Sequence, residues 1–294
     1  MKKLVIIILV CIAGINAWSQ QIPPMSQYVY NRYLINPAAT GITKDFPVAF
    51  TYRKLWAGIS ESPTVYYLTG NSTFFNSMAA GAKFINYQAG PLRKTGAELT
   101  YSYHFELNSD LNLSLGLSGL LYQFDLKKSE LNIEDPDDPV FAGTEKMFVP
   151  DASFGAYLYA DDYYVGLSVP QLFNRNIDLK SDNVLQEKQV RHYYLFGGYS
   201  YKIDKDFELD PSLMVKFIEA GLYQIDINVH TRIKDIFLAG ISFRSSDAII
   251  LQVGFNYKEM LFGYSYDITI SGLNAATFGS HEIQLIYTLP GFTK

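Results

Sequence analysis

The chain has 294 residues and a net charge of −5, and only 18 % of its residues are charged. Soluble domains average roughly 25 % charged residues, so this chain is poor in charge for its length. A mildly acidic chain without a basic stripe excludes nucleic acid as the expected partner. No run of about 18 apolar residues follows the N-terminus, which excludes a transmembrane helix beyond that point.

The N-terminus predicts a secretory signal peptide over residues 1–19. Lys2 and Lys3 form a positive region, residues 4–15 form an apolar stretch, and the sequence AWS at residues 17–19 provides a small-x-small cleavage pattern. A membrane anchor is the alternative interpretation, but about 12 apolar residues are too few to span a bilayer.

The only cysteine, Cys11, lies inside this signal. Val10 before it does not suit a lipoprotein cleavage site, which needs a small residue at that position. We therefore expect a mature protein without a thiol, a disulfide or a lipid anchor, as in exported proteins that do not rely on disulfides.

Residues 20–45 lack a clean alternation of apolar and polar side chains. They begin with QQIPPMSQYVYNRY, in which two prolines are followed by a mixture of aromatic and polar residues. We expect this segment to be an N-terminal periplasmic arm, a plug inside a lumen or a flexible tail.

The remaining chain alternates apolar and polar residues over many segments. From residue 97 the sequence reads AELTYSYHFEL, and after a short break at residues 108–110 the same pattern resumes through residue 118. A period of two predicts strands with one apolar face. The shortest connections cannot hold the crossover that parallel neighbours require, so the sheet is expected to be antiparallel. Further clear examples are residues 223–233, 249–257 and 262–269.

The connections between these strands alternate in character. Counting from Phe46, we expect roughly fourteen strands, an even number as in bacterial outer-membrane barrels. Every second connection is short and polar, namely residues 75–77, 108–110, 160–162, 204–206, 234–235 and 258–259. The others are longer or rich in Gly and Pro, namely residues 58–63, 90–95, 126–150, 173–187 and 271–279. Short turns at the periplasmic end and long loops at the other end are typical of transmembrane barrels.

Residues 46–294 are therefore expected to be all-β, a transmembrane antiparallel β-barrel of the outer-membrane type. Its apolar face would contact lipid and its polar face would line the lumen. Segments of about 10–16 residues exceed the usual strand length of 5–6 residues, and Tyr and Phe cluster near segment ends, as in interfacial girdles. A secreted β-sandwich is the alternative, in which the apolar face would pack inward against a second sheet.

Clustered carboxylates in the longest loop raise the question of a Ca²⁺ site, since Ca²⁺ binds clustered oxygen ligands. The loop lacks the Gly and the terminal Glu of an EF-hand, and prolines flank the acids. A solvated surface loop is the simpler interpretation of Glu134, Asp135, Asp137 and Asp138.

The histidines do not indicate a metal or catalytic site. None has a recognised metal-ligand spacing, and His104 and His230 fall on predicted polar faces. Ser280, His281 and Glu282 are the residue types of a catalytic triad, but neighbours along a strand point to opposite faces. Five cationic side chains either line a pore or extend to its rims: Arg53, Lys83, Arg232, Arg244 and Lys258.

Four sequence stretches make the chain similar to a known family. PMSQYVYNRYLINPAATG spans residues 24–41, and GYSYDITISGLNAATFGSHEIQLIY spans residues 263–287. TYRKLWAGISESPT at residues 51–64 and GLSVPQLF at residues 166–173 lie between them. Together they resemble the PorP/SprF family of type IX secretion system membrane proteins, from about residue 20 to residue 287.

This resemblance implies a bacterial outer-membrane barrel that works with the type IX secretion and gliding machinery. It implies partners rather than substrates: a cargo C-terminal domain or a surface adhesin, and periplasmic components of the translocon or its motor. No catalytic residue, metal or cofactor is implied. A general diffusion porin for small solutes is the first alternative, and an outer-membrane hydrolase is the second.

The family motifs also supply candidate partner-binding positions, distributed between the two ends of the chain. At Arg32, Tyr33 and Thr40 the sequence departs from the family pattern, which bears on the choice of cargo. The candidates are Ser26, Gln27, Tyr28, Asn36, Pro37, Gly41, Tyr264, Tyr266, Asp267, Gly279, Ser280, His281 and Glu282.

Overall fold

The computed structural model of the chain describes residues 23–130, 143–173, 176–178, 186–188, 190–219, 221 and 223–291. The expected signal peptide, Cys11 and the acid cluster at residues 134–138 lie outside the described residues. In the described part of the chain, no helix is long and apolar enough to cross a membrane.

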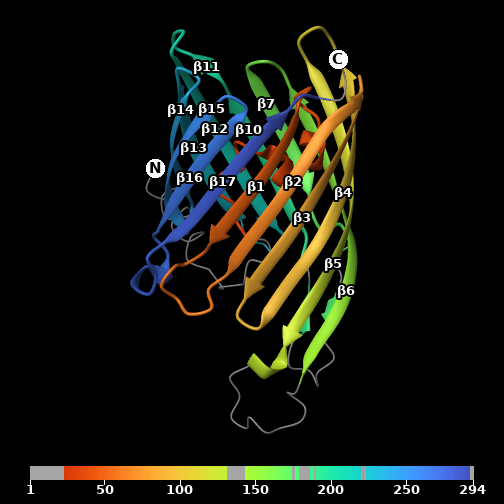
Figure 1. Cartoon of the computed structure of the whole chain (residues 1–294), viewed down its shortest axis with the longest axis vertical. Helices are drawn as coiled ribbons and strands as arrows, with labels where there is room; N and C mark the ends of the chain where they lie inside the picture. Colours follow the sequence, from red (N-terminus) through yellow and green to blue (C-terminus); the bar gives the residue numbers. More distant parts are fainter. Residues whose placement is uncertain are drawn as a thin grey trace, which may run out of the picture.

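The described chain is a single large antiparallel sheet that closes on itself as a barrel of 14 strands (Figure 1). The wall begins with β1 (Phe46–Lys54), β2 (Thr64–Phe75), β3 (Met78–Ala89), β4 (Leu92–Glu106), β5 (Asn112–Lys127), β6 (Thr144–Tyr159) and β7 (Tyr163–Val169). It continues with β10 (His192–Tyr199), β11 (Tyr201–Lys202), β12 (Phe207–Ile218), β13 (Tyr223–Ile233), β14 (Phe237–Arg244), β15 (Ala248–Tyr257), β16 (Met260–Thr269) and β17 (Ser280–Leu289).

Two pairings close the sheet. The first strand, β1, pairs with the last, β17, from Phe46 opposite Leu289 to Lys54 opposite His281. On the far side β10 pairs with both β7 and β12, and the short β11 prolongs β10 along β12. The predicted antiparallel barrel with an even number of strands is therefore confirmed. A separate hairpin of β8 (Asn176–Asp178) and β9 (Gln186–Lys188) does not join the wall.

The wall has the inside-out polarity that the alternation predicts. In β4 the apolar Leu99 is 71 % exposed on the outer face, whereas its polar neighbours Glu98 and Thr100 are buried on the inner face. In β5, Leu117 is 56 % exposed while Ser118 is buried. A soluble protein would reverse this arrangement, so the outer face is suited to hydrocarbon.

The connections lie mostly where the pattern predicts them. All six connections expected to be short join neighbouring strands directly, at the end of the barrel where β1 begins and β17 ends, which we call the short-turn end. The connection expected at residues 90–95 is shorter than that range, because β3 and β4 are joined by Gly90 and Pro91 alone, the two residues whose types marked it in the sequence. The strands around residues 126–150 also extend further than expected, to Lys127 in β5 and from Thr144 in β6.

At the opposite end of the barrel, which we call the long-loop end, the inner face is not uniformly polar. There the inward side chains are largely apolar, and β5 and β6 extend furthest toward this end, at the bottom of Figure 1. The buried cluster consists of Met25, Leu55, Val65, Tyr67, Ile85, Leu120, Tyr122, Phe124, Leu126 and Val149. The barrel therefore has an internal hydrophobic core, although the sequence pattern predicts that inward-facing side chains are polar.

The lipid-facing assignment of Leu117 can be tested by charge insertion. Leu117→Arg should lower the free energy of unfolding in lipid vesicles by about 2–4 kcal/mol, because Leu117 lies well within a spanning strand. Leu107→Arg is the matched control, since Leu107 is 53 % exposed but lies in the short β4–β5 turn. Denaturant titrations that give equal losses for both variants would contradict the assigned membrane position.

Candidate functional site

The lumen is occupied by residues 23–44, which we call the luminal segment. Its residues Ser26, Gln27, Asn36 and Thr40 are buried, although the segment has no strand of its own. Met25 lies beside the last residue of β14 at the long-loop end, whereas Thr40 lies beside Ser102 and His104 near the short-turn end. The segment thus runs along the inside of the barrel before it enters β1.

Hydrogen bonds from this segment reach strands all around the wall. Asn228 of β13 donates to the Tyr28 hydroxyl at 2.8 Å, and Asn31 donates to Thr69 of β2 at 3.0 Å. The Tyr33 hydroxyl lies 2.7 Å from Thr100 of β4, and Asn36 donates to the carbonyl of Ala156 in β6 at 3.1 Å. Because these strands surround the lumen, the segment is held from several sides at once.

Local sequence sets the bends of the luminal segment. The Asn36 side chain caps the short helix η2 (Pro37–Ala39) by accepting from the Ala38 N–H at 2.9 Å, and Pro37 suits the first helical position. Arg32–Leu34 forms a second short helix, η1. Gly41 has a φ of +69°, a conformation that favours glycine, and its backbone N–H donates to Asn71 Oδ1 at 2.8 Å.

Glycines on the wall make room for η2. A Cβ added at Gly155 in β6 would lie 1.9 Å from Asn36 Oδ1, and one added at Gly116 in β5 would lie 2.4 Å from the Ala38 nitrogen. Any larger residue at either position would displace the luminal segment. The wall and the segment are therefore fitted to each other at this point.

The start of the luminal segment is bound by a buried ionic cluster, which we call the inner ion cluster: Arg53, Asp226, Arg244, Asp267 and Glu282. Arg53 of β1 contacts Asp267 at 2.6 Å and Glu282 at 2.9 Å. Glu282 accepts hydrogen bonds from the backbone N–H groups of Ser26 and Gln27 at 2.8 and 2.9 Å. The Ser26 hydroxyl accepts from Arg53 and donates to Asp267.

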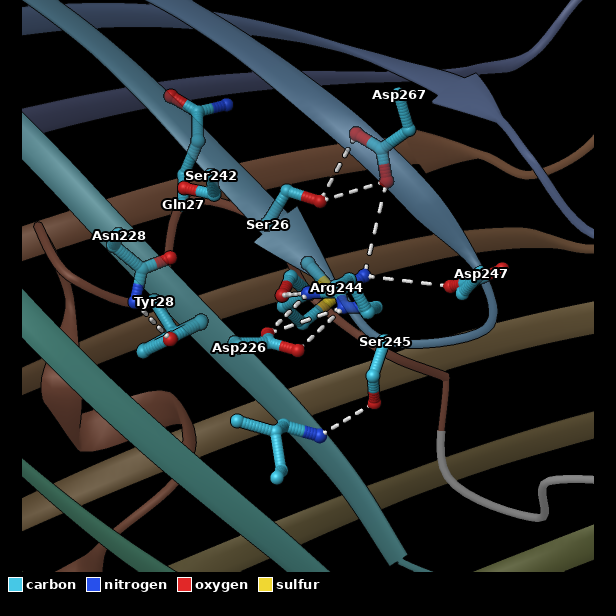
Figure 2. A network of polar contacts seen from close by, with 12 residues as sticks. Ser26, Gln27, Tyr28, Asp226, Asn228, Ser242, Arg244, Ser245, Asp247 and Asp267 are labelled. Carbon is cyan, nitrogen blue, oxygen red and sulfur yellow. Dashed lines mark hydrogen bonds and ion pairs between the residues drawn. The ribbon is translucent and has the colours of Figure 1, made fainter. Parts of the chain in front are cut away.

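Arg244 lies at the centre of the second half of the cluster (Figure 2). It contacts Asp226 at 2.9 Å, lies 3.8 Å from Asp267, and donates to the carbonyl of Met25 at 2.8 Å. Gln252 of β15 also donates to the carbonyl of Ser26. Side chains of the wall thus bind the N–H groups of Ser26 and Gln27 and the carbonyls of Met25 and Ser26, as buried peptide groups require.

The buried surroundings of the cluster disfavour charged groups that lack a partner. Burial raises the pKa of the Asp247 carboxyl, in the β14–β15 turn, above its ordinary value, although the Arg244 guanidinium opposes this shift. A buried ion pair contributes little net stability when intact, but removal of one partner is costly because it leaves the other charge uncompensated.

The structure brings together candidate residues from the two ends of the chain. Ser26 and Gln27 meet Asp267 and Glu282 in the lumen, more than 200 positions apart in sequence. Tyr28, Asn36, Pro37 and Gly41 follow along the luminal segment. These contacts bind the protein to itself, and whether any of them also binds a partner stays a prediction.

The other candidate residues lie on β16, on β17 and in the loop between them. Tyr264 and Tyr266 of β16 point away from the lumen together with His281, whose Nδ1 lies 2.7 Å from the Tyr264 hydroxyl. Ser280 faces inward and accepts from the Trp56 N–H, as expected from the opposite directions of neighbours in a strand. Gly279 has a φ of +88°, and its carbonyl accepts from the Ala57 N–H in the facing loop.

The histidines and cations predicted near the lumen separate into two groups. His104 and His230 are buried on the inner face, as expected, and so are Arg53, Lys83 and Arg244. Arg232 and Lys258 lie instead toward the short-turn end, where Lys258 forms part of the β15–β16 turn. Among the described residues, no group of three or more His, Cys, Asp or Glu side chains is arranged to hold a metal ion.

Sequence reasoning did not identify the inner ion cluster as a site. Arg53 and Arg244 were expected either to line a pore or to extend to its rims, and Asp226 was not singled out. The available signal was the position of each charge on the polar side of its strand. The alternation along a strand predicts that such a side chain points into the lumen, but it does not determine which other strands lie opposite.

The cluster can be tested by removing one charge. Glu282→Gln should lower the free energy of unfolding in vesicles by about 3–5 kcal/mol, because Arg53 would lose a buried partner. Glu219→Gln is the control: its side chain is 45 % exposed and lies 3.8 Å from Arg191, so its loss should cost at most about 1 kcal/mol. If chemical denaturation gives indistinguishable values for the two variants, the cluster does not anchor the fold.

Comparison with known proteins gives an independent view of this barrel. A search of curated proteins found no match. Among solved structures, the Ralstonia pickettii toluene transporter TbuX is similar with a TM-score of 0.53 and 8 % identity, over 88 % of this chain and 92 % of that chain. A Pseudomonas aeruginosa FadL homologue gives a TM-score of 0.47 and 11 % identity, over 92 % and 95 % of the two chains. At these identities the likeness concerns the fold.

The family assignment comes from the sequence match. The model of the family described as "Type IX secretion system membrane protein PorP/SprF" matches residues 17–287, nearly the whole chain. The predicted resemblance and the predicted outer-membrane location are confirmed by this match together with the barrel fold. The chain belongs to the PorP/SprF family and is a bacterial outer-membrane β-barrel of the type IX secretion system.

Proposed function

We propose that this barrel is a binding and assembly component of the type IX secretion and gliding machinery, not a general solute channel. In this proposal the barrel supports the secretion or surface attachment of cargo proteins such as adhesins. Its partners are a cargo C-terminal domain and periplasmic components of the translocon or motor.

One observation carries the proposal: the luminal segment occupies the lumen. A diffusion porin needs an open aqueous path, whereas residues 23–44 are hydrogen-bonded to the wall on several sides. The chain then divides into a signal peptide (residues 1–19), a luminal plug (residues 20–45) and the barrel (residues 46–294). The plug leaves the rims and loops as the surfaces available to a partner polypeptide.

The family-motif residues divide into two proposed roles. Ser26, Gln27, Asp267 and Glu282 would hold the plug through the inner ion cluster. The outward-facing Tyr264, Tyr266 and His281 form an aromatic surface on the wall, and aromatic side chains are enriched at interfaces. This surface is the proposed contact for a neighbouring membrane component.

The family and the fold point to a non-enzymatic role. The properties to be measured are therefore the binding of partners, the stability of the barrel and the closure of its lumen. Activity toward a small substrate is not expected.

The secretion role predicts a specific loss in the cell. Removal of this protein should leave a particular surface protein unsecreted or released into the medium, because its attachment partner would be absent. Mass spectrometry of surface, medium and periplasmic fractions measures this, with a strain that carries the restored gene as the control. Normal surface display of all type IX cargo in the deletion strain would reject the proposal.

If the luminal segment plugs the barrel, the wild-type protein should not conduct ions, and one methyl group added beside the segment should loosen the plug. Wild-type protein should show no steady conductance in planar bilayers, whereas Gly155→Ala should give intermittent openings and a stability loss of about 1–3 kcal/mol, because its Cβ would overlap Asn36. Gly119→Ala in β5 is the control, since nothing lies within 4 Å of its added Cβ. Steady open channels in the wild-type protein would favour the porin instead.

A further inference from the structure

A cavity of about 90 Å³ lies inside the barrel, between the wall and the luminal segment. Its lining includes Met25 and Pro37 from that segment and Lys94 and Tyr122 from β4 and β5. Lys94 is the third residue of β4 after the Gly90 turn, which places the cavity in the long-loop half of the barrel. No function discussed above uses this cavity.

The charge lining the cavity is predominantly positive. Lys83, Lys94, Lys216 and Arg244 line it from four different strands, and Glu98 is the one carboxylate among the described lining residues. Arg244 is already paired with Asp226. Glu98 lies 3.1 Å from the ammonium of Lys83, so part of this negative charge is already engaged. Charges in a space of low polarity interact more strongly than charges in water, so the cavity selects strongly by sign.

Aromatic rings hold the ammonium groups in position. The Lys94 nitrogen lies 3.9 Å from the centre of the Tyr122 ring, and the Lys216 nitrogen lies 5.9 Å from that of Tyr194. Both rings are buried, and together with Tyr67 they give the cavity an apolar surface. The cavity therefore presents fixed cations beside hydrocarbon and aromatic faces.

Gln171 adds an independent indication of a ligand. It lines the cavity, is 2 % exposed, and its side-chain oxygen has no hydrogen-bond partner among the described residues. Its φ of +60° is unusual for a residue other than glycine. Buried polar atoms without partners and rare backbone conformations concentrate at functional sites.

We propose that this cavity binds a carboxylate attached to a short apolar group. The carboxylate would lie between Lys94 and Lys216, since Arg244 is already neutralised by Asp226; the apolar group would contact the tyrosines, and Gln171 would accept from a donor on the ligand or from a bound water. The cavity of about 90 Å³ is small, so a free ligand would be a short acid, and a longer molecule would enter by its carboxylate end alone. Two sources share this chemistry: a free small organic acid and the C-terminal end of a polypeptide. The inference does not depend on the proposed secretion role.

The test uses the full barrel purified in detergent and five probes. Isovalerate is compared with isovaleramide and isoamylamine, which keep its branched carbon skeleton but are neutral or cationic. N-acetyl-leucine is compared with N-acetyl-leucinamide, which mimics a polypeptide end with its carboxylate removed. Calorimetric titration should give at least tenfold weaker binding for each amide than for its acid, and no binding of the amine. A rise in the unfolding temperature with the acids would provide a second readout.

Variants of the lining lysines test whether the acids bind in this cavity. Lys94→Met and Lys216→Met should each weaken binding of the acids at least fivefold, because methionine keeps the length of lysine but removes its charge. Lys258→Met, in an exposed turn at the short-turn end, is the control and should bind like the wild type. Each variant is first checked for a cooperative unfolding transition without ligand, and either lysine variant that folds is sufficient.

The outcomes separate the two sources and can overturn the site. Stronger binding of isovalerate indicates a free acid, whereas stronger binding of N-acetyl-leucine, weakened by Gln171→Leu, indicates a chain end whose N–H contacts Gln171. Equal affinity for acids and amides, absence of saturable binding of both acids, or binding unchanged in the folded lysine variants would each overturn the proposal.

Discussion

The fold depends on how two buried arginines are neutralised. Arg53 and Arg244 project into the lumen from β1 and β14, and their carboxylate partners come from β13, β16 and β17. The same carboxylates and guanidinium groups bind the backbone of residues 25–27. A buried charge without a partner is too costly to persist, so the strands and the luminal segment must assemble together. Closure of the barrel and occupation of its lumen are therefore parts of one arrangement.

The membrane imposes the complementary constraint on the outside. Unpaired backbone groups are not tolerated in hydrocarbon, so a sheet that spans a bilayer must close, and the pairing of β1 with β17 fulfils this requirement. Outward leucines and valines then contact lipid, while the inward polar groups have to find partners within a lumen that residues 23–44 fill. Glycines such as Gly116 and Gly155 let the segment approach the wall closely enough to supply those partners. At the long-loop end, an apolar cluster and a cavity lined by lysines lie between the wall and the segment.

The candidate site could be predicted in part. The motifs at the two ends of the chain pointed to Ser26, Gln27, Asp267 and Glu282, and the structure joins these four residues. Their partner Arg53 lies in the stretch at residues 51–64, but that stretch did not pair it with Asp267 and Glu282. The pair of Arg244 and Asp226 carried no motif, because a charged residue on the polar side of one strand resembles every other such residue. Gly and Pro marked the connection at residues 90–95, but only the strand pairing shows that Gly90 and Pro91 alone form it.

The local properties of this protein follow from its amino-acid order alone: the period-two alternation, the approximate number of strands, the short turns and the outward direction of the apolar face. They reflect the geometry of a single strand, in which successive side chains point to opposite sides. The position of the luminal segment, the pairing of the buried charges and the place where the inner face becomes apolar are set instead by the assembled barrel. Those properties depend on contacts such as that between Ser26 and Glu282, 256 positions apart, which exist only after the first and last strands have paired.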